Sequence, residues 1–168
     1  MKREITLILF FNLLFINTLF AYDNENKCED YLSKDKPAEA IIAAKSLTSK
    51  YDSNFCIAKA KYYQNDYAGA VEFFKKSTAH AELQADQMYS ILYKGIAQRD
   101  NKETKESTIT FKHGLETAKL GNSKYMQLEQ KFLYQIGLSL TEMKDYFNAT
   151  DYLAKSLMIA ANDDERAE

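Results

Sequence analysis

Side chains along most of the chain after residue 22 repeat with the period of an amphipathic helix. Residues that share one helical face recur at intervals of three, four and seven positions, as in the run Phe55, Lys59 and Tyr62. One proline and five glycines provide few turn residues, whereas a β-sandwich or barrel needs a turn about every 8 to 12 positions. The pattern therefore predicts an all-α protein, with helices at residues 25–34, 37–50, 53–65, 67–80, 82–99, 103–119, 123–143 and 146–161.

The first 21 residues have the pattern of a secretory signal peptide. Two basic residues at positions 2 and 3 precede an almost wholly apolar run at residues 5–20, and the small residue Ala21 follows. Cleavage after Ala21 would give an exported protein, periplasmic or secreted. Leu19 is larger than signal peptidases prefer two residues before the cut, so an inner-membrane anchor formed by residues 5–20 is the alternative.

The remaining chain has the size of one domain. We expect a helical repeat domain at residues 22–161 and a flexible polar tail at residues 162–168. The formal net charge of the whole chain is −2, which gives no electrostatic reason to expect nucleic acid or acidic lipid as a partner. Contact with a membrane is therefore expected only through residues 5–20, if they are not removed.

A unit of two helices joined by a tyrosine-containing turn recurs along the chain. In its clearest copy, residues 58–77, Ala58 precedes the turn at Asp66, and Ala70 and Phe74 follow it. Similar residue types stand in the same relative places near the C-terminus, at Gly137, Asp145, Tyr146, Ala149, Leu153 and Ser156. This pattern resembles the tetratricopeptide repeat (TPR), a family built from paired antiparallel helices.

Two weaker copies complete a series of four units. The small residues that mark the second helix of each unit are Ala40, Ala70, Ser107 and Ala149. They are 30, 37 and 42 residues apart, on either side of the roughly 34 residues of a regular repeat, which predicts longer helices or loops in the later units. The resemblance implies an α-solenoid of about four antiparallel helix pairs in a TPR-like right-handed superhelix, in which each pair buries its apolar sides against its neighbours.

Cys28 and Cys56 are the only cysteines of the chain. Both follow the expected cleavage site, and an oxidising compartment permits a disulfide between them. Each lies in the first helix of its unit, and the repeat register makes those helices neighbours. We therefore expect a Cys28–Cys56 disulfide, with two unpaired small apolar side chains as the alternative. A redox site is not expected, because the chain has no Cys-x-x-Cys motif.

Tyrosine is abundant, with twelve in the chain, and many lie in first helices. In TPR proteins these helices line a concave groove that receives peptides, so the resemblance implies such a groove here. Tyrosine supplies a large amphipathic contact area at low entropic cost. Aromatic stripes at helical spacing also form cores, so about half of the aromatic candidates are expected in the groove. The candidate groove residues are Phe55, Lys59, Tyr62, Tyr63, Tyr89, Tyr93, Ile96, Arg99, Lys131, Tyr134, Gln135 and Leu138.

No motif for catalysis, cofactor binding or metal binding is present in the sequence. His80 and His113, the only histidines, are not in a His-Glu-x-x-His arrangement or at zinc-binding spacing from a cysteine. The chain also lacks a Gly-x-Ser-x-Gly elbow, a Gly-x-x-x-x-Gly-Lys phosphate loop and a Gly-x-Gly-x-x-Gly fingerprint. We therefore expect no catalytic residues, no metal and no cofactor.

These features together predict an exported protein that is not an enzyme and that binds another protein or peptide segment. It would serve as an adaptor or scaffold in the cell envelope, in assembly, motility or secretion. One alternative is an envelope enzyme such as a cell-wall hydrolase, which would need a deep pocket with two inward carboxylates. The other is a structural protein that self-associates through its C-terminal unit, where Tyr152, Leu157 and Ile159 form an uncapped apolar end.

Overall fold

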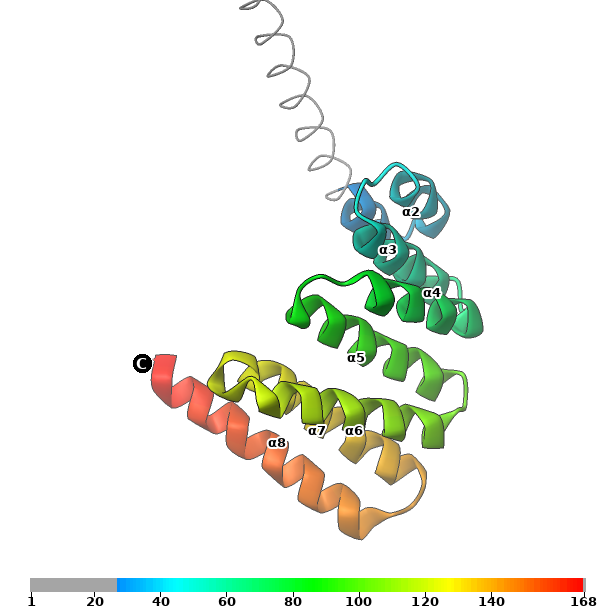
Figure 1. The fold of residues 1–168 in the computed structure, drawn as a ribbon. Helices are drawn as coiled ribbons and strands as arrows, with labels where there is room; N and C mark the ends of the chain where they lie inside the picture. Colours follow the sequence, from blue (N-terminus) through cyan, green and yellow to red (C-terminus); the bar gives the residue numbers. More distant parts are fainter. Residues whose placement is uncertain (1–26, 168) are drawn as a thin grey trace, which may run out of the picture.

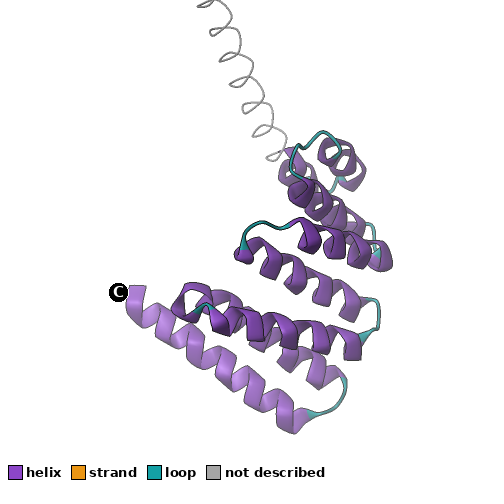
Figure 2. Ribbon diagram, in the orientation of Figure 1, coloured by secondary structure: helices purple, strands orange, loops and turns teal. Residues whose placement is uncertain are grey.

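The computed structural model describes residues 27–167, so the expected signal segment and its cleavage site lie outside the described residues. Within this range the chain is helical and contains no strand (Figures 1 and 2). Residues 27–33 belong to the first helix. The later helices are α2 (Pro37–Ala44), α3 (Lys50–Tyr63), α4 (Tyr67–His80), α5 (Gln84–Asp100), α6 (Thr104–Leu120), α7 (Met126–Glu142) and α8 (Tyr146–Ala167), with the short 3-10 helix η1 (Asn122–Tyr125) before α7. The predicted all-α class is confirmed.

The helices form antiparallel pairs that stack one after another, from the first helix and α2 at one end to α7 and α8 at the other (Figure 1). The two middle pairs are α3 with α4 and α5 with α6. From α2 onward, each helix packs against the next one in the chain, both within a pair and between pairs. The architecture is an all-α helical-repeat solenoid of four pairs, as predicted.

All four pairs turn through the same backbone geometry. After the left-handed residue of each turn, the N–H of the next residue donates to the carbonyl five positions earlier, at 2.8 to 2.9 Å. This hydrogen bond closes a Schellman motif, which satisfies a carbonyl at the end of the first helix. The left-handed residues are Asp35, Asn65, Lys102 and Lys144, with φ angles of 55°, 61°, 66° and 64°.

The shared turn places a small residue on each helix where the two helices of a pair cross. Seven positions before the left-handed residue lie Cys28, Ala58, Gly95 and Gly137. Five positions after it lie Ala40, Ala70, Ser107 and Ala149. All eight are buried. A Cβ at Gly95 would come within 2.4 Å of the Phe111 ring, so glycine is required for this close approach.

The irregular repeat spacing arises mainly from helix length, with a smaller contribution from the longer connection between α6 and α7. The second helices lengthen along the chain, from 8 residues in α2 to 14 in α4, 17 in α6 and 22 in α8. Because the turn and the crossing residues keep their relative positions, the added residues extend the far ends of the helices. The predicted lengthening of the later units is therefore confirmed, and it leaves the pairing of helices unchanged.

Several helix ends differ from the sequence prediction. The helix expected at residues 37–50 ends at Ala44, and α3 begins at Lys50 because the Ser49 hydroxyl accepts a hydrogen bond from the Asp52 N–H at 3.2 Å. The expected helix start at residue 53 is therefore wrong. A 3-10 turn precedes α7, and α8 continues to Ala167, past residue 161 where a flexible tail was expected.

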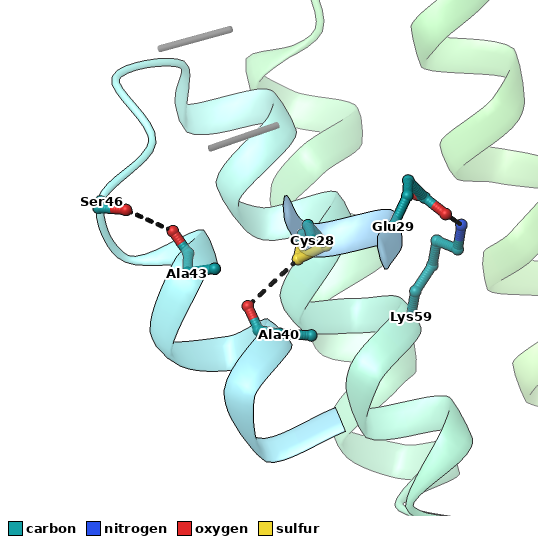
Figure 3. Close-up of a disulfide and its surroundings, with 7 residues drawn as sticks. Cys28, Glu29, Ala40, Ala43, Ser46 and Lys59 are labelled. Atoms are coloured by element: carbon teal, nitrogen blue, oxygen red, sulfur yellow. Dashed lines mark hydrogen bonds and ion pairs between the residues drawn. A yellow bond between two sulfur atoms is a disulfide. The ribbon is translucent and has the colours of Figure 1, made fainter. Parts of the chain in front are cut away.

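Cys28 and Cys56 link the first helix to α3 (Figure 3). Their Cα atoms are 6.2 Å apart, and the two sulfur atoms are at disulfide distance. Both cysteines are buried in a cluster with Leu32. The expected pairing of the two cysteines is confirmed.

Replacing both cysteines by alanine is expected to lower the free energy of unfolding by about 3 to 4 kcal/mol, because the bond restricts the unfolded chain over a sequence separation of 28 residues. Urea unfolding followed by circular dichroism measures the change. Dithiothreitol should shift the wild-type midpoint in the same direction and leave the Cys28→Ala/Cys56→Ala variant unaffected. Equal midpoints for wild type and variant without reductant would contradict the prediction.

Replacing Lys144 by glycine is expected to raise the free energy of unfolding by up to about 1 kcal/mol, because its φ of 64° is strained for a residue with a Cβ. Lys112 is the matched control, an exposed lysine inside α6. There the change to glycine should lower stability by about 1 kcal/mol. Thermal unfolding of the two variants should therefore show shifts of opposite sign, and a loss of stability in both would refute the turn geometry.

Candidate functional site

The candidate groove residues all lie on α3, α5 and α7, which are first helices of their pairs, as residues 27–33 are of the first pair. We call this side the first-helix layer. Across the stack, α5 also packs against α7, whereas no comparable contact joins α4 to α6 or α6 to α8. In the later part of the stack, the first helices α5 and α7 therefore approach each other more closely than the second helices α4, α6 and α8 do.

Residues at one repeat position join each first helix to the preceding one. The position lies nine residues before the left-handed turn residue and holds Cys56, Tyr93 and Gln135. Cys56 makes the disulfide to the first helix. The Tyr93 ring meets Phe55 of α3 edge-on, with ring centroids 5.6 Å apart. Gln135 accepts a hydrogen bond from Arg99 of α5 at 2.6 Å. A covalent bond, an aromatic contact and a hydrogen bond thus serve the same purpose in successive repeats.

Arg99 connects α5 to α7 rather than offering a free charge to a ligand. Its Nη1 donates to Oε1 of Gln135, and its Nε lies 3.6 Å from a carboxylate oxygen of Glu142 and 3.8 Å from one of Asp100. The Arg99 side chain is only 13% exposed. Its planar guanidinium has several donors in fixed directions, which suits a residue that bridges more than one partner.

Two other candidate side chains also join neighbouring first helices. The Tyr62 hydroxyl of α3 donates to the Asp100 carboxylate of α5, and burial, together with this hydrogen bond, raises the pKa of Tyr62 well above its usual range. The Lys59 ammonium lies 2.6 Å from the Glu29 carboxylate, beside the disulfide (Figure 3). Both side chains therefore stabilise the layer, and their partners, Asp100 and Glu29, are not among the residues that helical spacing singled out.

An aromatic cluster forms the centre of the layer. Phe55 meets Phe74 edge-on at 5.5 Å and stacks with Tyr51 at 5.5 Å between ring centroids. Tyr93 stacks on Phe74 at 5.8 Å, although its own ring remains exposed on one side. Because Phe74 is fully buried, the cluster connects the surface of the layer to the core.

The exposure of the twelve candidates divides them into two groups. The half-buried side chains are Phe55, Lys59, Tyr62, Tyr89, Ile96, Arg99, Gln135 and Leu138. The exposed side chains are Tyr63, Tyr93, Lys131 and Tyr134. The Lys131 ammonium lies over the Tyr89 ring, 5.5 Å from its centroid. Most half-buried members hold the layer together, and three of the four exposed members are tyrosines.

A depression not anticipated from the sequence lies where α3 and α5 begin. Two adjoining hollows of about 440 and 470 Å³ share Tyr51, Asp52 and Asp86 in their walls. The other lining residues of the first are Cys28, Glu29, Leu47, Phe55 and Cys56, and those of the second are Thr48, Ser49, Lys50, His80, Glu82 and Leu83. Only Phe55 among them was a candidate groove residue.

The shared wall of this depression is acidic. Burial raises the pKa of Asp86, and the neighbouring Asp52 carboxylate raises it further. The pKa of the Tyr51 hydroxyl is also raised, mainly by burial and then by Asp86. Two carboxylates that repel each other beside a partly apolar hollow provide a favourable place for a cation.

A third hollow, of about 430 Å³, lies between the start of α5 and the start of α7. It is lined by Ala85 and Tyr89 of α5 and by residues 123–128. The hollows therefore follow the edge of the first-helix layer where the loops between helix pairs lie.

No protein-family model matches this chain. No curated protein matches it either, so the resemblance to tetratricopeptide repeats depends on the repeat pattern. In the part of the chain that the structure describes, no helix is both long and apolar enough to cross a membrane. Over the same residues, no three side chains of histidine, cysteine or acidic type are grouped so that they could bind a metal ion.

Replacing Arg99 by alanine is expected to lower the free energy of unfolding by about 1 to 3 kcal/mol, because Gln135 and Glu142 would lose this partner and Asp100 would keep only Tyr62. Lys131→Ala is the matched control on the same layer and should cost less than about 1 kcal/mol, since that lysine is exposed. Urea unfolding of the two variants measures the difference. Equal effects would show that Arg99 does not join α5 to α7.

Proposed function

We propose that this chain is an exported TPR-like protein whose first-helix layer binds a segment of another protein, as an adaptor or scaffold in the cell envelope. The observation that carries the proposal is the row of exposed tyrosines and open hollows along one layer of a solenoid. A row of this kind suits an extended or helical segment, which can contact several repeats at once.

The preorganisation of the tyrosines supports this proposal. Tyr93 is held by Phe55 and Phe74, and Tyr89 lies under the Lys131 ammonium. Side chains that are already ordered lose little conformational freedom when a partner binds. The same rings supply an apolar face and a hydroxyl, so that they can contact both the side chains and the backbone of a bound segment.

The acidic depression indicates the charge of the bound segment. Asp52 and Asp86 repel each other across a hollow that Tyr51 and Phe55 also line. A lysine or arginine of the partner placed there would relieve the repulsion and could stack its stem on the rings. We therefore propose a partner segment that carries a basic residue, and we expect its binding to weaken with added salt.

Export is the part of the proposal that depends on the N-terminal sequence. The basic and apolar pattern of residues 1–21 matches a secretory signal. The paired cysteines are compatible with it, because disulfides persist mainly in oxidising compartments.

One observation also bears on the hydrolase alternative. Asp52 and Asp86 are two neighbouring carboxylates, and the pKa of Asp86 is raised, as general acid catalysis requires. Their hollow is open along the loops, however, and would not shelter a small substrate from water. The geometry therefore favours the binding of a segment over the hydrolysis of a sugar.

Binding is tested by crosslinking and affinity purification from cells that express the full chain. A Tyr63→Ser/Tyr134→Ser variant is expected to recover at least ten-fold less partner, because it removes two exposed rings while Tyr93, which packs on Phe55, and Tyr62, which hydrogen-bonds Asp100, stay in place. Ile109→Ser/Leu120→Ser is the matched control, with two exposed apolar residues on the second helix α6.

Equal recovery by wild type, variant and control would overturn the groove proposal. An Asp52→Asn/Asp86→Asn variant distinguishes the binding of a basic segment from the hydrolysis of a cell-wall substrate. Loss of a salt-sensitive partner supports the acidic depression as a binding site, whereas loss of a cell-wall hydrolytic activity shown by the wild type would support the enzyme.

A further inference from the structure

The outer face of the last helix, α8, is exposed and mainly apolar from Phe147 to Ala161. The face comprises Phe147, Thr150, Ala154, Leu157, Met158 and Ala161, all of which are exposed. These residues follow one another at intervals of three, four or one, so they form one stripe on the helix. The opposite side of α8, with Ala149 and Ser156, is buried against α7. We call the stripe the α8 outer face.

Part of this face corresponds to positions that the next helix pair covers elsewhere in the stack. Relative to the small crossing residue, Leu157 of α8 stands where Leu115 stands in α6. Leu115 is 6% exposed, in the cluster that contains Phe132 and Leu133 of α7, whereas Leu157 is 70% exposed. Thr150 has the same relation to Thr108, which is buried.

The rest of the face differs from α6, the second helix of the preceding pair. At the positions equivalent to Phe147, Ala154, Met158 and Ala161, α6 carries the exposed charged residues Lys105, Lys112, Glu116 and Lys119. These positions stay in solvent even when another helix pair follows. In α8 they are apolar, and Phe147 is 87% exposed. The apolar surface is therefore wider than the surface that one further repeat would cover.

We infer that the α8 outer face pairs with the same face of a second copy of this chain, with the two α8 helices antiparallel. In this arrangement Ala154 lies at the two-fold axis, and residues whose numbers add up to 308 lie opposite each other. Phe147 of one copy then meets Ala161 of the other, and Met158 meets Thr150. Phe147 and Met158 thus each face a smaller side chain, Leu157 lies opposite Asp151, and the central alanine allows the helices to approach closely.

The charges beside the stripe select the antiparallel direction. Asp151 and Lys155 lie together along one edge of the face, with 2.6 Å between their charged atoms. In the antiparallel pair, Asp151 of one copy comes within about one helical turn of Lys155 of the other, so opposite charges attract across the axis. A parallel pair would place Asp151 against Asp151 and Phe147 against Phe147.

The test is analytical ultracentrifugation of the protein recovered after expression of the full chain. We expect a dimer with a dissociation constant on the order of micromolar, since the stripe is a single helix face. The Phe147→Lys/Met158→Glu variant introduces the residues that α6 carries in solvent at the same positions. It should keep its circular dichroism spectrum and dissociate at least ten-fold more readily.

The matched control is Ile109→Lys on α6, because Ile109 is 69% exposed, like Leu157. This variant should remain as dimeric as the wild type. A monomeric wild type, or a dimer that Phe147→Lys/Met158→Glu leaves intact, overturns the inference. The wild-type protein would also be monomeric if residues 5–20 were not removed and covered the α8 outer face, and this result too would overturn the inference.

Disulfide crosslinking tests the direction of the pair. Ala154→Cys should form a covalent dimer, because residue 154 lies at the axis. Thr150→Cys should not form one, since its counterpart is opposite residue 158, about 12 Å away along the helix. Efficient crosslinking through Thr150→Cys would refute the antiparallel arrangement.

Discussion

The left-handed turn inside each helix pair is the constraint on which the rest of the structure depends. It places a small residue seven positions before the turn and another five positions after it at one crossing point, in all four pairs. The partner helix can approach the backbone closely there because the crossing residue is small: a Cβ at Gly137 would lie 3.4 Å from the Ala149 carbonyl oxygen, and the Phe111 ring packs directly on Gly95. Because the crossing is fixed, each pair presents the same two sides to its neighbours, so that successive pairs can stack in the same way. Helix length and loop length can then vary without changing the pairing.

The side chains of the first-helix layer have two tasks, and repeat position separates them. At the position of Cys56, Tyr93 and Gln135 the residue reaches back to the preceding first helix, by a bond, a ring contact or a hydrogen bond. The fold requires a link between neighbouring first helices at this position, but the link can be of any of these three chemical types. Side chains directed away from these links are free to face a partner, as Tyr134 is. The residues of a binding surface can therefore change without disturbing the links that hold the repeats together on the same layer.

The sequence was sufficient for the fold because the fold depends on local spacing. Ala58, Ala70 and their equivalents could be found without knowing which helices meet, since the turn lies between them in the chain. Helix ends were less predictable. The apolar pattern continues from α2 through Leu47, which hides the end of that helix. Ser49 caps α3, four residues before the helix start expected at residue 53. A short polar loop inside an otherwise helical pattern leaves little trace in periodicity.

The candidate site was harder to predict because it depends on contacts between helices that are distant in sequence. Arg99 and Gln135 are 36 positions apart, and spacing within one helix could show only that each lies on the same face of its own helix. The depression beside Tyr51 combines the starts of two helices, so Asp52 and Asp86 are read as ordinary first-turn acids when each helix is considered alone. Their meeting follows from the stacking of repeats.

The two ends of the solenoid meet the same physical requirement in different ways. A linear stack leaves each terminal pair with one neighbour, so that an end must be stabilised or covered by other means. At the N-terminal end α2 has only 8 residues, too few for much apolar burial, and the disulfide compensates by linking the first helix to α3. At the C-terminal end α8 has 22 residues and an apolar outer face that charged residues occupy in α6. If that face were only the remnant of a lost repeat, its solvent-exposed positions would carry charged or small residues, as Lys105 and Glu116 do in α6 and as Ala68 and Ala79 do in α4. Phe147 and Met158 are instead large and apolar, as expected of a surface that is covered in the working protein. The C-terminal end is therefore better explained as an interface than as an unfinished repeat.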